Sequence, residues 1–267
     1  MNNSYDIDNP MAPLWFMYPF ISRYSIGWRM GFGEHYKTQF GEWFSALSAE
    51  DKNKFRDMFP PPKGWLGWYE KPYVDDDHYD DEGDLLWNQD GMPVYTLARL
   101  KEKRRNNENM EYLFFGELQS GSGGPIAEAC LSHGWEAEFE METDAFASIE
   151  QYLAAEKARL FDEECYTEEK WANKRYSVAL NGNLAKFLQN EKLMHILLQT
   201  GDKVLVAVSL HDEIWGIGLA AGEKEINNPL AWRGQNWAGF ALMEVRDELK
   251  RICQHYSKLK LQELHEQ

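Results

Sequence analysis

The 267-residue chain has few cysteines, few basic residues and no long hydrophobic run. Its three cysteines, Cys130, Cys165 and Cys253, lie far apart without a Cys-x-x-Cys pair, which indicates reduced thiols and excludes a disulfide scaffold. The longest aliphatic stretch, residues 204–208, is far shorter than the ~20 residues of a membrane span. The first ten residues are polar and acidic, so we expect no secretory signal, no membrane contact and a cytoplasmic location.

Positive charge is also scarce. The chain carries 28 basic and 44 acidic residues, a formal net charge of −16, and residues 111–267 alone carry 15 basic and 26 acidic residues. Proteins that bind nucleic acid over a broad surface are basic, so this class is disfavoured. A single nucleotide in a local pocket remains compatible with the charge.

Several motifs that would indicate a metal or a cofactor are missing. There is no GxxxxGK[ST], GxSxG or HExxH sequence, and WGIGLAAG at residues 215–222 has the spacing GxGxxxG rather than that of a dinucleotide fingerprint. The acidic run at residues 75–84 lacks the ligand order of a calcium loop. His133 follows Cys130 by three residues without a second such pair, which disfavours zinc. We therefore expect no metal and no cofactor.

Aromatic residues, in contrast, are concentrated near the N-terminus. Seventeen of the 38 lie within residues 15–73, interspersed with glycines and followed by three prolines at 60–62, which favours turns and short elements. Ser48 predicts the N-cap of a helix that ends near Phe59. The charged stretches at 75–84 and 101–110 are typical of loops.

The pattern becomes regular beyond residue 110. Apolar spacing predicts helices that open at Ser148, at Asn183 and near Trp237, and short strands over 112–115 and 203–209. We expect a mainly α protein with a few short strands. Its predicted parts are an aromatic-rich N-terminal extension over residues 1–105, a helical domain over 111–254 and a C-terminal helical tail over 255–267.

Two acidic residues and a lysine lie within otherwise apolar stretches of the sequence. Glu150 and Lys157 lie seven residues apart on one predicted helix face, about 10 Å along the axis. Ala154 lies between them and leaves room for a flat ligand. Asp212 follows a predicted strand and precedes a Gly-x-Gly turn, a common position for a catalytic acid. Ordinary surface charges and a simple turn are the alternative interpretations.

Trp171 and Arg175 are spaced to share a helix face, where tryptophan could stack on a base and arginine could bind a phosphate. Core packing, or a cation–π contact, is the alternative interpretation of this pair.

Taken together, these segments resemble the YbiA-like, or NADAR, family. The resemblance covers about residues 111–254 and rests on SIEQYLAAEKARLF, WANKRYSVALNGNLAKFLQNEKLMHILLQTGDKVLVAVSLHDEIWGIGL and PLAWRGQNWAGFALMEVRDEL. The family pattern has a Glu-Gln/His-Tyr helix with a lysine seven residues after its glutamate. It continues with Trp-x3-Arg, Lys-Phe-x-Gln-Asn, Leu-Leu-x-Thr-Gly, Asp-x-x-Trp-Gly-x-Gly and Trp-x-Gly-x-Asn, all present here in this order.

The resemblance implies a mainly α-helical N-glycosidase that cleaves a bond between a ribose C1′ and a nitrogen. Substrates known for the family are phosphorylated ribosylamino-pyrimidine intermediates of riboflavin synthesis and ADP-ribose attached to guanine. By motif, Glu150, Lys157 and Asp212 correspond to the catalytic residues, and the lysine is one proposed in some relatives to form a Schiff base with the opened ribose. The substrate-binding residues implied are Trp171, Arg175, Asn190, Trp215, Gly216, Gly218 and Asn236.

The required chemistry agrees with this assignment. Cleavage needs an acid for the leaving base and a carboxylate that steadies positive charge at C1′ or activates water. Alternatively, a neutral lysine amine attacks C1′ after ring opening. Either route needs a flat apolar slot, which tryptophans supply.

One departure concerns a helix that carries Lys-x-Leu-Gly-Arg in relatives. Here only DEECYTEEK joins Phe161 to Trp171, so that helix and its expected phosphate contacts are missing. The basic side chains that could replace them are Arg175, Lys186, Arg23 and Arg29.

Other functions stay open at this point. The expected partner is a small ribosylated nucleotide or metabolite. The same chemistry could remove ADP-ribose from guanine in nucleic acid, and a non-catalytic NAD- or ADP-ribose-binding module is a third possibility. The N-terminal extension could be a lid on the glycosidase domain or a separate carbohydrate- or partner-binding module. The oligomeric state has no sequence signal.

Overall fold

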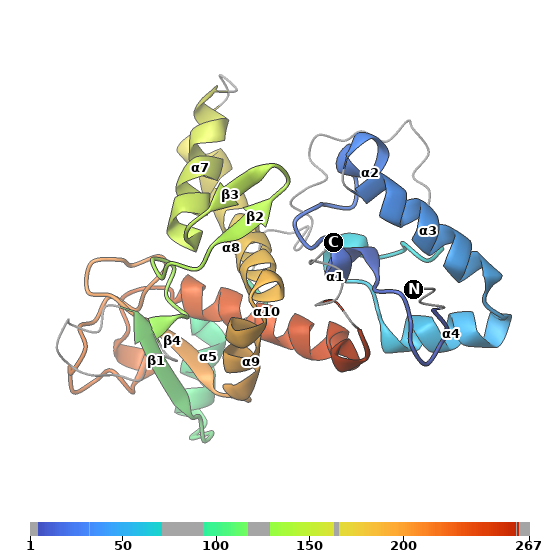
Figure 1. Ribbon diagram of the computed structural model, residues 1–267. Helices are drawn as coiled ribbons and strands as arrows, with labels where there is room; N and C mark the ends of the chain where they lie inside the picture. The colour runs from blue at the N-terminus through green and yellow to red at the C-terminus, as the bar shows by residue number, and fades with distance from the viewer. Residues whose placement is uncertain are drawn as a thin grey trace. The chain divides into compact units, whose positions relative to one another are not determined.

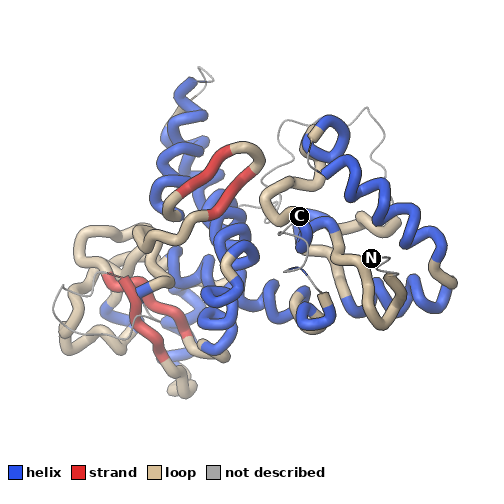
Figure 2. The backbone as a smooth tube through the Cα atoms, in the orientation of Figure 1, coloured by secondary structure: helices blue, strands red, loops and turns tan. Residues whose placement is uncertain are grey.

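Helices make up most of the computed structural model, which describes residues 5–31, 33–70, 93–116, 129–162, 166–259 and 261. Figure 2 shows the predominance of helix over strand, so the prediction of a mainly α chain with a few short strands is confirmed. The acidic stretch at residues 75–84 and Cys165 lie outside the described residues. The chain divides into two compact units, the first formed by Met1–Leu86, Glu140–Asp144 and Glu248–Gln267, the second by Trp87–Phe139 and Ala145–Asp247.

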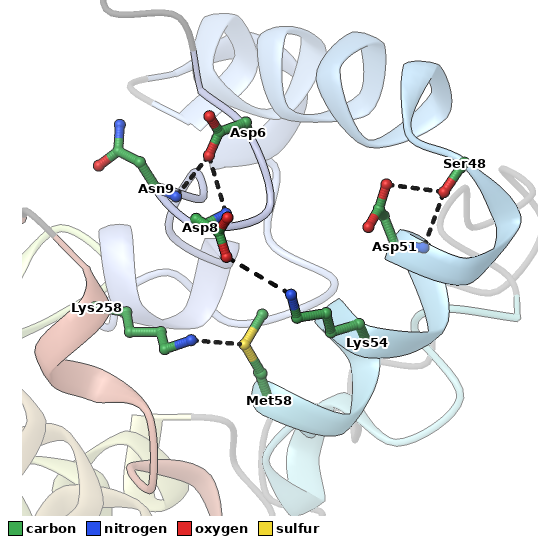
Figure 3. A network of polar contacts seen from close by, with 8 residues as sticks. All are labelled: Asp6, Asp8, Asn9, Ser48, Asp51, Lys54, Met58 and Lys258. Atoms are coloured by element: carbon green, nitrogen blue, oxygen red, sulfur yellow. Dashed lines mark hydrogen bonds and ion pairs between the residues drawn. The ribbon is translucent and has the colours of Figure 1, made fainter.

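Helices of the first unit follow one another closely along the chain (Figure 1). Ser48 caps one of them as predicted, because its hydroxyl accepts the backbone N–H of Asp51 at 3.1 Å (Figure 3). The composition favours turns and short elements in the aromatic region, whereas one helix there is 14 residues long and buries Tyr36 and Phe40. The elements are α1 (Leu14–Met17), α2 (Gly27–Met30), α3 (Gly33–Ala46), α4 (Ala49–Met58), η1 (Lys63–Trp65) and η4 (Tyr256–Lys258).

Aromatic rings form the core of this unit. Trp15 is 2% exposed, and its ring centroid lies 5.6 Å from Trp65, 5.8 Å from Trp68 and 5.9 Å from Tyr69. The rings meet tilted or edge to face, the arrangement that the aromatic quadrupole favours. The described aromatic residues between Trp15 and Tyr69 therefore form a packed core.

Both the beginning and the end of the described chain join this unit (Figure 3). Asp8 forms an ion pair with Lys54 of α4 at 3.6 Å, and Asp6 accepts the backbone N–H of Asp8 at 2.9 Å. From the other end of the chain, Lys258 Nζ lies 3.5 Å from the sulfur of Met58. The described residues after Glu248 thus belong to the same unit as the N-terminal helices.

The second unit contains the two-stranded parallel sheet and the long helices. Strands β1 and β4 pair in register from Tyr112 with Val204 to Gly116 with Val208, and β4 is buried throughout. Parallel strands need a long crossover connection, which the intervening helices supply. The elements of this part of the chain are α5 (Leu97–Arg105), β1 (Tyr112–Gly116), β2 (Phe139–Met141), β3 (Asp144–Phe146), α7 (Ile149–Asp162), α8 (Glu168–Gln189), α9 (Glu191–Gln199), β4 (Val204–Val208), η3 (Pro229–Ala231) and α10 (Trp237–Ile252).

Helices α7 and α8, which are consecutive in the chain, pack against each other (Figure 1). Ser148 opens α7 as predicted, and its hydroxyl accepts the N–H of Gln151 at 3.2 Å. A Cβ added at Gly182 of α8 would lie only 2.5 Å from a ring carbon of Tyr152, whose side chain is buried. The glycine therefore permits the close approach of the two helices.

Two predictions about helix boundaries were wrong. Asn183 does not open a helix but lies inside α8, where its amide donates to the carbonyl of Ala179 one turn earlier at 2.8 Å. The helix ends instead at Gln189, and α9 starts two residues later. Residues 101–105, predicted as loop, form the end of α5, which belongs to the second unit.

The packing at Gly182 gives a stability prediction. Gly182→Ala should lower the free energy of unfolding by about 1–3 kcal/mol, because the added methyl group has no space beside Tyr152. Thermal unfolding followed by circular dichroism measures the effect. Gly64→Ala is the matched control, since its Cβ meets nothing within 4 Å, and an equal shift in both variants would contradict the prediction.

Candidate functional site

Asp212 lies in the loop that follows β4, as the sequence predicts for a site residue. Its Oδ1 accepts the backbone N–H groups of Ile214 at 2.9 Å and Trp215 at 2.8 Å. Aspartate commonly folds a turn in this way by bonding to the backbone two or three residues ahead. One carboxylate oxygen therefore holds the turn, and the half-buried side chain has a fixed orientation.

The two glycines after Trp215 allow this turn to pack closely. A Cβ at Gly216 would lie 2.8 Å from Cβ of Ser209 and 2.9 Å from the carbonyl oxygen of Asp212. Gly218 has a φ of +68°, a conformation that side chains rarely adopt. Both glycines are buried, so their role in the structure is to shape the loop that carries Asp212 and Trp215.

Asn236 joins this loop to β4. Its side chain is fully buried, accepts the N–H of Ala207 at 2.8 Å and donates to the carbonyl of Leu205 at 2.9 Å. Its own N–H donates to the carbonyl of Gly216 at 2.9 Å. Both ends of the amide are thus engaged with the backbone of the strand.

Asn190 has a similar position at the junction of α8 and α9. Its amide donates to the carbonyl of Lys186 at 2.9 Å and to that of Glu138 at 3.1 Å. The side chain thereby ties the end of α8 to the segment before β2.

Glu150 lies in the first turn of α7 with an exposed side chain. Its backbone N–H donates to the carbonyl of His133 at 3.0 Å. A Cβ built on Gly134 would lie 3.1 Å from Oε2 of Glu150, so the carboxylate lies close to the residue after His133. The beginning of α7 and the loop at residues 132–135 therefore form one local group.

The ring of His133 connects this group to the Asp212 loop. Its centroid lies 5.1 Å from the indole of Trp215, edge to face. Trp215 in turn meets Trp237 of α10 at 6.2 Å, and the guanidinium of Arg175 lies over the ring of Trp237 at 4.9 Å. An aromatic wall of His133, Trp215 and Trp237 therefore runs from Glu150 toward Arg175.

His133 is uncharged in this setting. Burial and the nearby positive charge of Lys186 lower the pKa of its imidazole to about 4, although the carboxylate of Asp212 acts in the opposite direction. Its Nε2 is enclosed and has no hydrogen-bond partner within the described part of the chain. Asp212 is thus close enough to His133 to influence its charge.

Lys186 is an unusual residue of α8 because its side chain is 1% exposed. Its Nζ donates to the carbonyl of Cys130 at 3.2 Å, and burial lowers the pKa of the amine to about 8. Desolvation disfavours the charged form of a lysine. Through this hydrogen bond the amine holds the segment that leads from Cys130 to His133.

Lys157 lies apart from this cluster. Its Nζ forms an ion pair with Glu168 at 3.8 Å and lies over the ring of Tyr166 at 5.8 Å. Among the described residues no hydrogen bond or ion pair joins it to Glu150 or Asp212. Trp171, buried in the first turns of α8, and Arg175 follow Glu168 on the same helix.

The structure therefore brings together three of the predicted residues, Glu150, Asp212 and Trp215, around His133. Arg175 reaches this group through Trp237 rather than through Trp171. Three predicted binding residues, Asn190, Gly216 and Asn236, are engaged with the backbone. Within the described ranges no group of three His, Cys, Asp or Glu side chains could hold a metal ion.

Comparison with known proteins gives two relatives and one family. The NADAR domain model matches residues 162–250. The chain is 36% identical to N-glycosidase R617 of Acanthamoeba polyphaga mimivirus over 127 residues, which are 39% of this chain and 74% of the viral protein. The chain belongs to the NADAR family. Glu150 and Lys157 precede the range of the NADAR model, whereas Asp212, Trp215 and Asn236 fall inside it.

Two further similarities are weaker or shorter. The NADAR chain is 42% identical to Protein irg-1 of Caenorhabditis elegans over 79 residues, which cover 30% of this chain and 37% of that protein. The NMR structure of YbiA from E. coli matches 52% of this chain and 85% of its own, with a TM-score of 0.40 and 21% identity. The described helices of this NADAR chain include none long and apolar enough to cross a membrane.

Three residues of the site were not predicted as such from the sequence. His133 was considered only as a zinc ligand, Lys186 only as a possible phosphate contact, and Trp237 only as the start of a helix. Their importance depends on contacts with residues distant in the sequence, such as Trp215 and Cys130. A lysine within the apolar text ALNGNLAKFLQ was the one available signal of burial.

The backbone contacts of Asn236 give a second stability prediction. Asn236→Ala leaves the N–H of Ala207 and the carbonyl of Leu205 without side-chain partners inside a buried strand. Each such group costs about 1–3 kcal/mol, so the free energy of unfolding should fall by about 2–6 kcal/mol in urea titrations. Asn228→Ala, which removes the cap of η3 and one exposed hydrogen bond to Glu225, should cost about 1 kcal/mol. Similar losses in the two variants would count against this role of Asn236.

The buried amine of Lys186 gives a pH-dependence. The unfolded chain holds this proton up to the ordinary pKa of 10.5, whereas the folded chain releases it near 8. Between these values the unfolded state binds more protons, so Lys186 makes stability rise with pH by at most about 1.4 kcal/mol per unit. Urea titrations at pH 7.5 and 10 should show that Lys186→Met loses this rise, while exposed Lys192→Met keeps it. An unchanged rise in Lys186→Met would refute the assignment.

Proposed function

We propose that this chain hydrolyses the bond between C1′ of a ribose and a nitrogen of a nucleotide-like metabolite, with Glu150 and Asp212 as the two catalytic carboxylates. Membership of the NADAR family and similarity to a protein named N-glycosidase support the glycosidase class. The observation that carries the assignment of residues is that both acids adjoin one aromatic group, His133 with Trp215.

The two carboxylates have different surroundings, which suits two different roles. Glu150 is exposed and its side chain is not engaged in a turn, so it can exchange a proton with water and with the leaving nitrogen. Asp212 is fixed by two backbone N–H groups, which suits a group that stabilises positive charge developing at C1′ without moving.

The proposed reaction is a direct hydrolysis. Glu150 accepts a proton as water attacks C1′, and the C1′–N bond breaks with its electron pair leaving on nitrogen. The same proton then passes from Glu150 to that nitrogen, and the water oxygen remains on C1′ as a hydroxyl. The rings of Trp215 and Trp237 supply the apolar surface on which a base could lie, with Arg175 near its edge as the candidate contact for a phosphate.

Two classes of substrate fit this arrangement. A phosphorylated ribosylamino-pyrimidine and an ADP-ribosyl-guanine conjugate both offer a ribose, a flat base and phosphate. The acidic surface favours a small metabolite over a base within a nucleic acid, since phosphate backbones bind basic surfaces. A release assay with both substrate types, scored for free base, tests the proposal. Binding of ADP-ribose without any release would instead support the non-catalytic module.

Substitution of the two carboxylates tests their roles. Glu150→Gln should abolish turnover, and Asp212→Asn should lower kcat by ~10²–10³, because it removes a fixed charge at nearly constant shape. Glu213→Gln changes an exposed acid of the same loop and should retain activity. The measurement is the rate of base release at unchanged melting temperature. Full activity of Glu150→Gln, or a loss below about tenfold in Asp212→Asn, would remove that residue from the mechanism.

Lys157 separates direct hydrolysis from a Schiff-base route. Nζ of Lys157 is engaged by the carboxylate of Glu168 at 3.8 Å, so we expect a role in charge rather than as nucleophile. Lys157→Arg should keep a substantial part of the activity that Lys157→Met loses. Borohydride added during turnover should leave no ribose adduct on Lys157 in mass spectrometry. An adduct together with an inactive arginine variant would overturn direct hydrolysis in favour of the imine route.

A further inference from the structure

The hairpin of β2 and β3 leads directly into the first turn of α7 (Figure 2). Its two strands are joined by a two-residue turn, Glu142 and Thr143. Turns of this length favour glycine at their first position, because that residue takes a positive φ. Glu142 occupies this position with a φ of +55°. A glutamate in a conformation that suits glycine persists only where its surroundings hold it there.

The contacts that hold Glu142 come from the segment before α2. Its backbone N–H donates to the carbonyl of Phe20 at 2.7 Å, and its carboxylate accepts the N–H of Ser22 at 2.9 Å and the hydroxyl of Ser25 at 2.5 Å. The carbonyl of Ser22 in turn accepts the indole N–H of Trp28, which is buried in the aromatic core. Residues 140–144 accordingly belong to the same unit as the N-terminal helices.

The other end of the hairpin is fixed to α7. Phe146 is buried, and its ring centroid lies 5.1 Å from that of Tyr152. The N–H of Ala147 donates to Oε1 of Gln151 at 2.7 Å. Glu150 directly precedes these two residues of α7, and its own side chain is exposed. The place of its carboxylate therefore depends on where the hairpin holds the first turn of the helix.

We propose that Glu142 is a positioning residue for Glu150. By anchoring the turn of the hairpin, the carboxylate of Glu142 fixes the first turn of α7 and with it the proposed catalytic acid. This inference rests on the proposed function, which has Glu150 at C1′ of the substrate. A group that transfers a proton has to lie within hydrogen-bond reach of its target, and a displacement of about 1 Å can lower a rate by about 10²-fold.

A clamp that only stabilises the fold is the competing explanation of the same contacts. Glycine at position 142 separates the two roles. Glu142→Gly removes the carboxylate, but it also removes the strain of a side chain at positive φ, so the turn keeps its shape. The variant should therefore remain folded while the hairpin loses its bonds to Ser22 and Ser25.

Hydrogen exchange followed by mass spectrometry tests the inference without turnover. The amides of residues 150–152 are hydrogen-bonded in the structure and should exchange slowly in the wild-type chain. In Glu142→Gly they should exchange at least about tenfold faster at an unchanged melting temperature, because the first turn of α7 opens more often. Glu142→Gln keeps an acceptor for the N–H of Ser22 and should restore most of the slow exchange.

Thr143→Gly is the matched control, because it places a glycine in the same turn at an exposed residue and leaves the carboxylate of Glu142 intact. It should exchange like the wild-type chain at residues 150–152. Ser25→Ala removes one donor from the opposite side of the contact and should raise exchange at the same amides, which keeps the test decisive if Glu142→Gly unfolds. Faster exchange confined to residues 139–145, or no change in any variant, would overturn the inference.

The rate of base release gives a second readout that a stabilising clamp would leave unchanged. Glu142→Gly should lower kcat at least about tenfold with KM nearly constant, because the acid is displaced while the aromatic wall is untouched. Glu142→Gln should recover most of kcat. A rise in KM at constant kcat would contradict the positioning role.

The two readouts keep this inference apart from the proposed function. Faster exchange at residues 150–152 in Glu142→Gly, with no base released from any substrate by the wild-type chain, would contradict the N-glycosidase and leave the anchoring of α7 supported. Release of base with unchanged exchange and unchanged kcat in Glu142→Gly would contradict the role of Glu142 alone.

Discussion

The buried amide of Asn236 is the interaction on which the arrangement of the site depends. It bonds to β4 at two points, and the backbone N–H of the same residue holds the glycine turn that follows Asp212. Its φ of +57° redirects the chain into α10, whose first residue is Trp237. One residue therefore joins the strand β4, the loop that carries Asp212 and the start of α10, and the two N–H bonds to Asp212 complete the turn.

Apolar spacing and capping residues were enough to predict the helices and strands that depend on local sequence alone. The strands at 112–116 and 204–208 and the starts of α7 and α10 follow from apolar spacing and from Ser148, and the structure confirms them. The predicted start at Asn183 was wrong because an asparagine can bond to the carbonyl one turn earlier as readily as it can cap a helix. The packing of Gly182 against Tyr152, beside Asn183, joins separate helices and has no local sequence signal.

The residues of the site also divide into those that local sequence marks and those that depend on contacts between distant segments. Glu150, Asp212 and Trp215 could be predicted because motif spacing marks them, and their catalytic roles stay predictions. His133 and Lys186 could not, because the properties that matter, a low pKa and an enclosed nitrogen, arise from burial among distant segments. Lys157 illustrates the converse, since seven-residue spacing puts it on the face of Glu150 while its nearest charged partner is on the following helix.

The composition of the first unit has a consequence for how this chain folds during synthesis. Its aromatic helices come from the first seventy residues, but they also contact Tyr256 and Lys258, and the backbone N–H of Lys63 donates to Glu248. Folding on the ribosome proceeds from the N-terminus, and these last contacts form only after nearly all of the chain has emerged. The tryptophan-rich unit is thus synthesised before residues 248–258 that complete it, and its apolar rings are open to chaperones in the interval.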